Sequence, residues 1–563
     1  MIETILTPTA LWKNFELPET IGANIVQEQT TKGITFSKLQ LEGRSVKDGK
    51  VSIYAELMRP SKKEQLPAIL LVEGFGVDSN SLVAKDLVKR GYAVLMVDLA
   101  GKMQDKENYT VYPQSINYAN YEIASQDIYG VKKDAKATCW YEWCATIKYA
   151  LKYLRDLTYI TKVGVFGVST VATAVWQILG SEQDLGAGVI ALNSGWIGYK
   201  GIYKFGGMVE PQFTTEMCQF IAGIDSQSYA MHVKAPMLLL SATNDNNFDV
   251  DRAQDTMSKI PEQTYSATYL SANYTDRISF SAYSNALVFF DKYLCGAKVN
   301  VPNGAEIKCD LVGGKVVLEV QTDEKLVNSV DKVEIFVSEE MIQPQLRCYE
   351  KIDVKKSQNG KFTAKYLPYS GSEIIFAYAN VYYKNGLKLS TSIVAKRFTV
   401  EQVGNSFKNN ILYSSRKNNS HSIFSSAMAI KGDKNIETTD SNLVVEKKGP
   451  MGINGVTCRG GLLTFALASK KYQPKNGSML LLDAYVKEPK ALTVKLISNY
   501  FGEKIEYFVK INLLGGDIWQ NIMIEMNKFK TAEGMTLKDY SKIDALEITV
   551  DDGEYLINNA LWV

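Results

Sequence analysis

Histidine is the scarcest chemically active residue in this sequence. Only His232 and His421 occur among 563 residues, so a mechanism that needs an imidazole has two candidates. No apolar run is long enough to cross a bilayer. The net charge of +2 gives no electrostatic reason to expect nucleic acid or an anionic membrane as a partner. We therefore predict no nucleic-acid partner and no membrane partner.

Cysteine is also too sparse to define a site. The seven cysteines are an odd number scattered over a long chain, which does not indicate a disulfide framework. No two pairs of them have metal-ligand spacing, and we predict neither a metal nor a cofactor. The amino terminus has no basic start and no long apolar core, so it is not typical of a secretory signal. A cytoplasmic location is predicted, and secretion is the alternative.

The length of the chain exceeds what one hydrophobic core organises. Hydrophobic residues make up 46% and charged residues 22%, as in an ordinary globular protein. Changes of pattern along the chain predict four segments. They are a mixed α/β domain at 1–302, an immunoglobulin-like β-sandwich at 303–400, a polar connector at 401–436 and a jelly-roll-like β-sandwich at 437–563.

The segment 162–177 has the pattern of a strand, a sharp turn and a helix. Val163 and Val165 alternate along a short apolar run, and Ser169 stands at the turn before helix-compatible residues. This arrangement is typical of a nucleophile elbow, which needs small residues two positions before and two positions after the serine. Gly167 meets the first demand, and Val171 stands where a second glycine is usual. The alternative is a surface serine that caps an ordinary helix.

The elements around this turn predict a mostly parallel sheet with flanking helices. Continuous apolar runs are typical of buried parallel strands, and helical periods separate them. The strands are expected at 66–72, 92–98, 187–193 and 235–245, after paired strands within 34–60. The helices are expected at 81–90, 136–157 and 279–294.

Three motifs in this order resemble one known superfamily. They are Leu-Leu-Val-Glu-Gly-Phe-Gly at 70–76, Gly-Val-Ser-Thr-Val-Ala at 167–172, and Leu-Ser-Ala-Thr-Asn-Asp at 240–245. With them, residues 34–296 resemble the α/β-hydrolases, close to the dienelactone-hydrolase and acetylxylan-esterase-like branch. The resemblance implies a serine hydrolase of carbohydrate or small acyl esters.

The same resemblance implies the roles of individual residues. Ser169 matches the nucleophile and Asp245 matches the acid of a Ser-acid-His triad. Asp249 and Asp251 are rival candidates for the acid. The oxyanion donors would be the backbone amide of Thr170 and an amide at Gly74 or Phe75.

The position of the triad histidine holds a different residue. The resemblance places that histidine within 271–280, where Thr275 or Asp276 stands. Two carboxylates do not reproduce an imidazole that accepts, turns and donates a proton. His232 precedes the amino end of a strand, whereas sites in parallel sheets lie at the carboxyl end. His421 lies in the polar connector and would have to fold back.

Two classes of function therefore stay open for the first domain. One is a serine ester hydrolase with an incomplete triad, in which Asp276 stands in for the histidine beside Ser169 and Asp245. The other is a catalytically inactive hydrolase-like scaffold or carbohydrate-binding protein. The expected partner is a small molecule or a carbohydrate ester in either case.

The rest of the chain predicts two all-β domains. Turn signals at Gly313-Gly314, Asn359-Gly360 and Asn385-Gly386 separate short strands, as in an immunoglobulin-type sandwich. The last segment resembles the jelly-roll carbohydrate-binding modules in its strand pattern. Tyr500, Phe501 and Trp519 are its candidates for stacking on sugar rings, and the alternative is that these aromatic side chains belong to the sandwich core.

Overall fold

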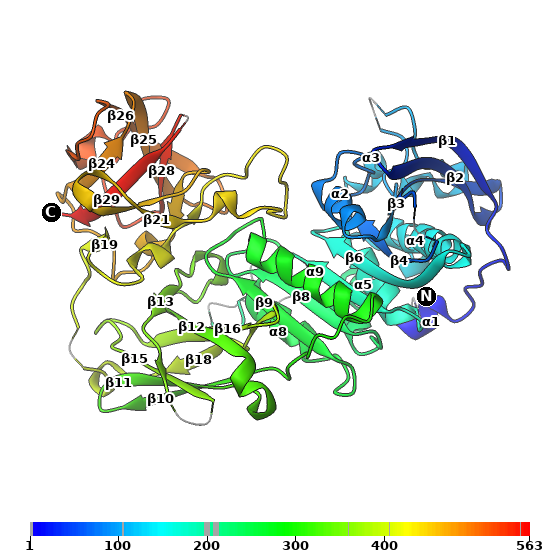
Figure 1. Cartoon of the computed structure of the whole chain (residues 1–563), viewed down its shortest axis with the longest axis horizontal. Coiled ribbons are helices and arrows are strands. Elements are labelled where there is room, and N and C mark those ends of the chain that lie inside the picture. The colour runs from blue at the N-terminus through cyan, green and yellow to red at the C-terminus, as the bar shows by residue number, and fades with distance from the viewer. Residues whose placement is uncertain are drawn as a thin grey trace. The chain divides into compact units, whose positions relative to one another are not determined.

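The computed structural model divides the chain into two compact units (Figure 1). It describes residues 4–62, 64–103, 106–195, 203–206, 213–357, 360–404, 406–551 and 553–563. The first unit consists of Met1–Ser241, Asp251–Thr268 and Tyr283–Val299. The second unit consists of Ala242–Val250, Tyr269–Ala282 and Asn300–Val563.

A mixed sheet with the strand order β1-β2-β3-β5-β4-β6-β7-β8-β9 forms the centre of the first part of the chain. Strands β1, β2, β3 and β5 pair in antiparallel fashion, and β5, β4, β6, β7 and β8 run parallel. The parallel strands are buried on both faces, which explains their continuous apolar runs. The bounds are β1 (Ala23–Thr31), β2 (Ile34–Val46), β3 (Gly49–Pro60), β4 (Leu66–Val72), β5 (Ala93–Val97), β6 (Ile160–Val168), β7 (Ala187–Ala191), β8 (Met237–Ala242) and β9 (Ser266–Ser271).

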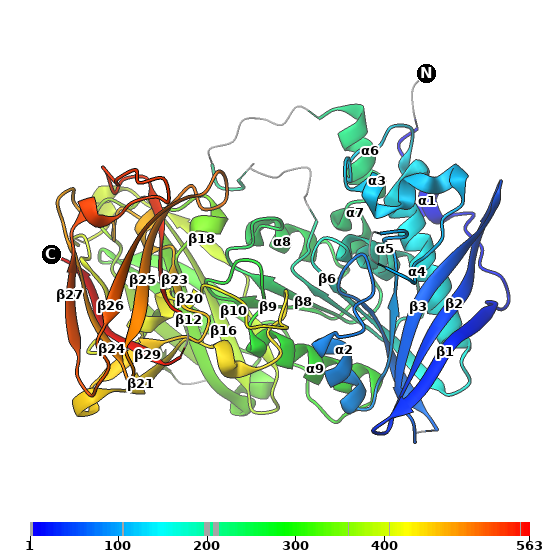
Figure 2. The ribbon, with the colours of Figure 1, turned by 90° about the horizontal axis from the view of Figure 1, so that it is seen from above.

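Helices cover both faces of this sheet (Figure 2). Residues three apart on a strand face opposite ways. A side chain at Gly164 would meet Leu294 of α9, and one at Gly167 would meet Val175 of α5. Helix α2 lies on the α9 face and α4 on the α5 face. The bounds are α1 (Pro8–Trp12), α2 (Leu82–Lys89), α3 (Tyr121–Ala124), α4 (Cys139–Asp156), α5 (Ala172–Ser181), α6 (Thr215–Gly223), α7 (Ser226–Ala230), α8 (Val250–Met257) and α9 (Phe280–Leu294).

Side-chain caps fix where the helices begin. The hydroxyl oxygen of Ser81 accepts a hydrogen bond from the amide of Ala84 at the start of α2. Thr138 accepts one from the amide of Tyr141 at the start of α4. Such caps satisfy amides that have no partner within the helix. The predicted helices at 81–90, 136–157 and 279–294 correspond to α2, α4 and α9.

The region from Asn300 contains antiparallel sheets, as predicted. The first pair has the orders β10-β11-β15-β14 and β13-β12-β16-β17, with β18 on β16. Gly313 and Gly314 make the turn between β10 and β11, and Gly386 lies in the turn after β16; all three have positive φ angles. Asn359 lies outside the described residues. The bounds are β10 (Glu306–Val312), β11 (Lys315–Gln321), β12 (Val330–Glu339), β13 (Glu350–Ile352), β14 (Lys355–Lys356), β15 (Lys361–Tyr366), β16 (Ile374–Tyr383), β17 (Lys388–Ser390) and β18 (Val394–Arg397).

The second pair of sheets closes the chain. Their orders are β21-β22-β29-β24-β27, with β19 on β29, and β20-β23-β28-β25-β26. Strands β19 and β20 lie within 401–436, so this predicted connector contributes strands to the last sheets. The bounds are β19 (Ile411–Ser414), β20 (Ser425–Ser426), β21 (Val445–Lys448), β22 (Asn454–Thr457), β23 (Leu462–Thr464), β24 (Leu480–Val486), β25 (Lys490–Ser498), β26 (Ile505–Leu513), β27 (Gln520–Ile524), β28 (Ile543–Val550) and β29 (Tyr555–Trp562).

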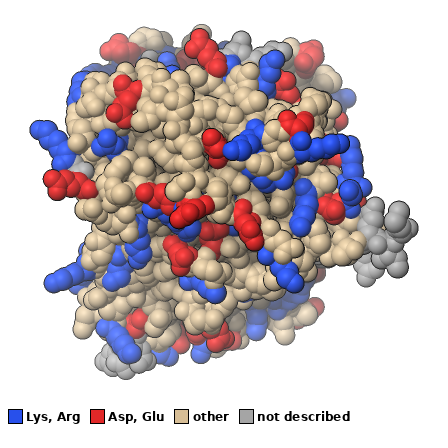
Figure 3. Space-filling model, turned by 90° about the vertical axis from the view of Figure 1, so that its right-hand side faces the viewer, with Lys and Arg blue, Asp and Glu red and all other residues tan. Residues whose placement is uncertain are grey.

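The predicted fold class is confirmed: a mixed sheet with flanking helices is followed by antiparallel β-sheets. Within the described ranges, no helix combines the length and the apolar character needed to cross a membrane. The face drawn in Figure 3 carries lysine and arginine side chains in several groups, with aspartate and glutamate side chains among them.

Candidate functional site

Ser169 lies in the turn between β6 and α5, where the sequence predicts an elbow. Its φ angle is 59°, in the left-handed region that residues other than glycine, asparagine and aspartate rarely adopt. A Cβ atom at Gly167 would lie 2.8 Å from the Cβ atom of Val175 and 2.9 Å from that of Ala172. Glycine is therefore required at 167 to let the helix start so close to the strand. Val171, in the place of the second glycine, is buried.

Asn193, which nothing in the sequence marks as a site residue, follows the neighbouring strand β7 and holds this turn. Its side-chain amide donates hydrogen bonds to the carbonyl oxygens of Ser169 (3.0 Å) and Thr170 (3.3 Å) and to the hydroxyl oxygen of Thr173 (3.0 Å). Its side-chain oxygen accepts a hydrogen bond from the Ser226 hydroxyl at 3.0 Å. In the sequence, Asn193 is visible only as an asparagine that follows a buried strand. Such asparagines are common, so this position alone does not identify a site residue.

The backbone amides that are predicted as oxyanion donors have no acceptor within the described residues. The amide of Ser169 donates to the carbonyl oxygen of Ala191 at 2.8 Å. Among the hydrogen bonds of the described residues, none has the amide of Thr170, Gly74 or Phe75 as its donor. Amides without an internal acceptor are available to an oxygen of a ligand.

Strand register brings the second group of predicted donors to the elbow. Strands β4 and β6 are parallel neighbours, and Val72 is the register partner of Gly167. Gly74 and Phe75 therefore leave the sheet beside the residues that lead into Ser169. The carbonyl oxygen of Phe75 accepts hydrogen bonds from the amides of Leu99 (2.7 Å) and Ala100 (2.8 Å), which fixes the loop. The oxyanion role of these amides stays a prediction.

A lysine also lies against this loop. A Cβ atom at Gly76 would lie 1.9 Å from Nζ of Lys106, so only glycine lets the ammonium group approach the backbone here. Nζ of Lys106 is 3.9 Å from Oδ1 of Asp98. Burial raises the pKa of Asp98 to about 6, despite hydrogen bonds from Thr110 and Gly101 and the nearby Lys106 charge. The glycines at 74 and 76 predict that another group approaches the backbone closely, but they do not predict that this group is Lys106.

Asp245 follows β8 and belongs to the second unit, as does Asp276, whereas Ser169 belongs to the first. Oδ1 of Asp245 accepts hydrogen bonds from the amides of Asn247 (2.8 Å) and Phe248 (3.1 Å). Burial raises the pKa of Asp245 to about 7, and the negative charge of Asp276 acts in the same direction. A carboxyl group with a pKa in this range exchanges protons near neutral pH.

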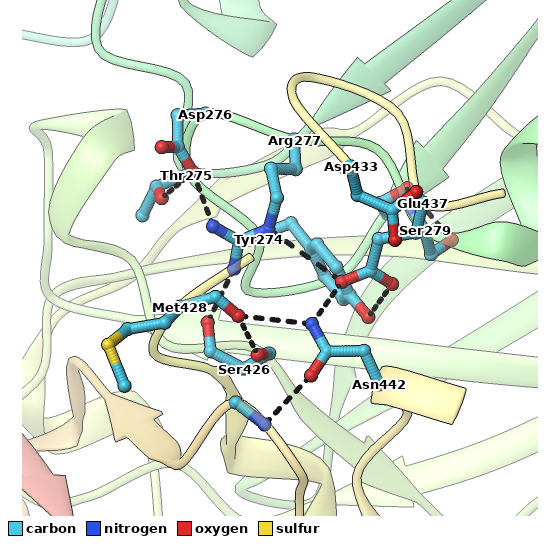
Figure 4. Close-up of polar contacts among 12 residues, drawn as sticks. Tyr274, Thr275, Asp276, Arg277, Ser279, Ser426, Met428, Asp433, Glu437 and Asn442 are labelled. Atoms are coloured by element: carbon cyan, nitrogen blue, oxygen red, sulfur yellow. Dashed lines mark hydrogen bonds and ion pairs between the residues drawn. The ribbon is translucent and has the colours of Figure 1, made fainter. Parts of the chain in front are cut away.

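The loop expected to carry the triad histidine is held by hydrogen bonds and an ion pair (Figure 4). The side chain of Asp276 is 71% exposed, and its Oδ1 atom accepts hydrogen bonds from Thr275 (3.0 Å) and Arg277 (3.1 Å). The next side chain, Arg277, is buried and donates to the carbonyl oxygen of Ser426 at 2.8 Å.

A buried carboxylate completes this arrangement. Glu437 is 3.7 Å from Nε of Arg277, and it accepts hydrogen bonds from the Tyr274 hydroxyl (3.1 Å) and the Asn442 amide (2.7 Å). Figure 4 shows these side chains converging on Glu437. The position predicted for a base is thus held by an ion pair and hydrogen bonds to the segment 426–442.

The two histidines lie in different parts of the chain. His232 lies between α7 and β8, before the amino end of β8, whereas Ser169 follows the carboxyl end of β6. Because β6, β7 and β8 are parallel, His232 lies at the amino ends of these strands and Ser169 lies at their carboxyl ends. Nδ1 of His421 is 3.5 Å from the carboxylate of Glu446, and burial lowers the pKa of this histidine despite that carboxylate.

The predicted sugar-stacking aromatics lie in two places in the last sheets. The rings of Tyr500 and Phe501 pack on the buried ring of Phe465, with centroids 4.9 Å and 5.5 Å away. Trp519 is half-buried and donates to the carbonyl oxygen of Pro450 at 3.1 Å. A Cβ atom at Gly455 would lie 2.9 Å from the Trp519 indole. Sugar binding by these aromatics stays a prediction.

The first part of the chain is similar to known proteins. A model of the X-Pro dipeptidyl-peptidase family (S15 family) matches residues 48–224. No curated protein matches the chain. The predicted resemblance to the α/β-hydrolase superfamily is confirmed, and the chain carries an α/β-hydrolase-like domain.

Three solved structures illustrate the similarity. An acetyl xylan esterase from a Paenibacillus species is 14% identical, with 51% of this chain and 92% of that chain covered and a TM-score of 0.39. Acetyl xylan esterase 1 from a Thermoanaerobacterium species is 14% identical, with 48% and 90% covered and a TM-score of 0.36. An acylaminoacyl peptidase from Pyrococcus horikoshii is 13% identical, with 49% and 51% covered and a TM-score of 0.33.

Proposed function

We propose that this protein is a serine hydrolase of acylated carbohydrates or other small acyl esters, with Ser169 as its nucleophile. The observation that carries the proposal is the backbone of Ser169, which has a φ angle of 59°. A strained residue of this kind costs about 1–3 kcal/mol and persists only where its surroundings impose it. Asn193 imposes the conformation through hydrogen bonds to the Ser169 and Thr170 carbonyl oxygens.

The proposed reaction has the two halves of acyl transfer. The Oγ atom of Ser169 attacks the acyl carbon, and the resulting oxyanion accepts hydrogen bonds from the amide of Thr170 and from Gly74 or Phe75. The alcohol leaves with a proton, and water then hydrolyses the acyl-serine.

In this proposal Asp245 is the acid of the triad, and Asp276 stands in for the histidine that would take the proton of Ser169. The pKa of Asp245 is about 7, so this group is partly ionised at neutral pH. Loss of the histidine from a complete triad lowers turnover by about 10⁶-fold in a working hydrolase, so we expect slow turnover.

Labelling with a fluorophosphonate, read by intact mass, tests the proposal. The parent should acquire a single adduct over a day, and Ser169→Ala should acquire none. Ser45→Ala, at an exposed serine of the same unit, should label like the parent. Asp245→Asn should label far more slowly, and labelling of the parent should rise with pH through about 7. An unlabelled parent, or equal labelling of Ser169→Ala, overturns the proposal.

The second candidate function is that of a catalytically inactive hydrolase-like scaffold that binds carbohydrate. It is favoured by the buried Arg277 and Glu437 in the place of a mobile base. This function predicts that the parent binds neutral xylo-oligosaccharides. Trp519→Ala should lose this binding, and Phe407→Ala should keep it. Phe407 is the control because its side chain is 86% exposed.

A further inference from the structure

A groove opens on the first unit beside helix α2. It encloses about 670 Å³ and is lined by residues of β1, β2, β3 and the segment 79–89. Small-molecule sites in proteins have volumes of about 300–1,000 Å³, so the groove has the size of a ligand site. None of Ser169, Thr170, Gly74 and Phe75 lines it.

The strand pattern explains why this face of the sheet is open. Thr35 and Ser37 of β2 are buried, whereas Phe36 and Lys38 alternate with them and line the groove. Helix α2 packs on β3 and β5 and leaves β1 and β2 uncovered on this side. Phe36 pairs in register with Met58 of β3, and together they form an apolar floor.

Four lysines give the groove its charge. Lys32 lies in the turn between β1 and β2, Lys38 lies in β2, and Lys85 and Lys89 lie in α2. Within the part of the chain that the structure describes, no ion pair joins any of them to a carboxylate. Like charges that converge without a counter-charge repel one another, and an anion relieves that repulsion. Their gathering contrasts with a net charge of only +2 for the whole sequence.

Two of these lysines are placed by the local backbone. Lys32 has a φ angle of 51° in the turn between β1 and β2, a conformation that lysine rarely adopts. Nζ of Lys85 donates to the carbonyl oxygen and to the side-chain oxygen of Asn80, both at 3.3 Å. The ammonium group of Lys85 is thus held at the rim of the groove, and the backbone of Lys32 is fixed in its turn.

An acidic side chain near the floor, Glu56, is hydrogen-bonded through one of its two carboxylate oxygens. Glu56 is the register partner of Lys38 on β3 and is buried. Its Oε1 atom accepts hydrogen bonds from the hydroxyls of Tyr54 (2.7 Å) and Ser79 (2.9 Å). No ion pair forms between Glu56 and Lys38 in the described structure. This carboxylate therefore does not take the place of an external anion.

We propose that the groove binds an acidic oligosaccharide, in which carboxylates lie along a chain of hydroxyl-bearing rings. The lysine ammonium groups pair with separate carboxylates as point charges, whereas arginine would be expected for bidentate phosphate recognition. Gln27, Gln29 and Asn80 supply side-chain amides that both donate to and accept from sugar hydroxyls.

The apolar floor and the composition of the lining favour a sugar over other polyanions. Phe36 and Met58 offer a surface for the apolar face of a ring. Single-stranded nucleic acid is usually held by several stacking aromatics, and Phe36 is the only aromatic residue among those that line the groove. The inference goes beyond the proposed hydrolase function, because it concerns other residues and its readout is binding, independent of any labelling of Ser169.

Isothermal titration of the full chain with tetragalacturonate tests the inference. The acid should bind, and its methyl ester should not, because esterification removes the charges that face the lysines. Lys38→Ala and Lys85→Ala should each weaken binding by about two- to five-fold, as expected for partly exposed ion pairs. Lys133→Ala, at an exposed lysine outside the groove, is the matched control and should bind like the parent. Raising the salt from about 50 to 300 mM should weaken binding, because it shortens the screening length.

Each remaining outcome decides against the proposal. Pentaglutamate that binds as tightly as tetragalacturonate would mean a surface for acidic peptides. Equal binding of the acid and its methyl ester would mean that the lysines do not select the ligand. Tetragalacturonate that fails to bind, or that binds Lys38→Ala, Lys85→Ala and the parent alike, would exclude this groove as the site. Urea unfolding of the variants controls for loss of fold.

Discussion

The side-chain amide of Asn193 donates a hydrogen bond to the carbonyl oxygen of Ser169 at 3.0 Å. Asn193 follows Leu192, whose φ angle is 54°, so two neighbouring strands each leave the sheet through a left-handed residue. The amide of Leu192 donates to the carbonyl oxygen of Leu240 at 2.9 Å. The conformation of the elbow is therefore set by β7 and β8 as well as by its own sequence.

Replacing Asn193 should loosen the elbow. Asn193→Ala leaves a buried acceptor on Thr173 and two part-buried acceptors on Ser169 and Thr170 without their donor. A lost partner for a buried polar group costs about 1–3 kcal/mol. We expect a loss of that size in the free energy of unfolding in urea, together with slower fluorophosphonate labelling. Asn24→Ala, on the exposed strand β1, should change neither quantity, and an unchanged Asn193→Ala would contradict the role assigned to it.

The strain at Ser169 should be measurable by substitution. At a φ angle of 59°, glycine avoids a steric cost that is about 1–2 kcal/mol for other residues. Ser169→Gly should therefore unfold at a higher urea concentration than Ser169→Ala, by about 1 kcal/mol after the greater flexibility of glycine in the unfolded chain is counted. Both variants lack the hydroxyl, so its loss cancels in the comparison. Equal stability of the two would mean that the turn relaxes freely.

The sequence predicts the elbow and the strands because their signals are local. Buried parallel strands read as continuous apolar runs, and Gly167 and Ser169 stand at fixed offsets from one of them. Strand β1 gives no such signal, because all nine of its residues are exposed and its pattern lacks an apolar side. Exposure on both faces removes the alternation on which the prediction of strands depends.

Contacts between segments distant in sequence could not be predicted in this way. Asn193 reaches Ser169 from another strand, and Glu437 reaches Arg277 across 160 residues of chain. From the sequence alone, an arginine and a glutamate are expected at the surface, because no local pattern marks these two as buried. The same holds for the lysines of the groove, which come from a turn, a strand and a helix and meet only in the folded unit.

The raised pKa of Asp245 predicts how stability depends on pH. Burial holds this pKa at about 7 in the folded protein, above its ordinary value of 3.8. The folded state therefore binds the proton more tightly than the unfolded state, and this stabilisation is present below about pH 4 and is lost as the pH rises through 7. For a shift of this size the loss is on the order of 4 kcal/mol.

Asp245→Asn, which is neutral at every pH, removes this component. The difference in unfolding free energy between parent and variant should shift in favour of the variant between pH 5 and pH 8, as measured in urea. Asp184→Asn, at an exposed aspartate, should follow the parent. Parallel stability curves for the parent and Asp245→Asn would mean that Asp245 titrates like an exposed carboxyl group.

Lys471 should contribute more to the free energy of unfolding than an exposed lysine does, because it neutralises buried carboxylates. Its Nζ atom is 2.7 Å from Glu350 and 3.0 Å from Glu339. Burial alone lowers the pKa of Lys471, but the two carboxylates outweigh burial and hold that pKa well above its ordinary value. Lys471→Met leaves both carboxylates buried without a counter-charge, which costs about 3–5 kcal/mol in unfolding free energy. Lys361→Met, which breaks an exposed pair with Glu319, should cost less than about 1 kcal/mol in the same urea titration. If the two variants unfold alike, Glu339 and Glu350 take up protons or water when the lysine is absent.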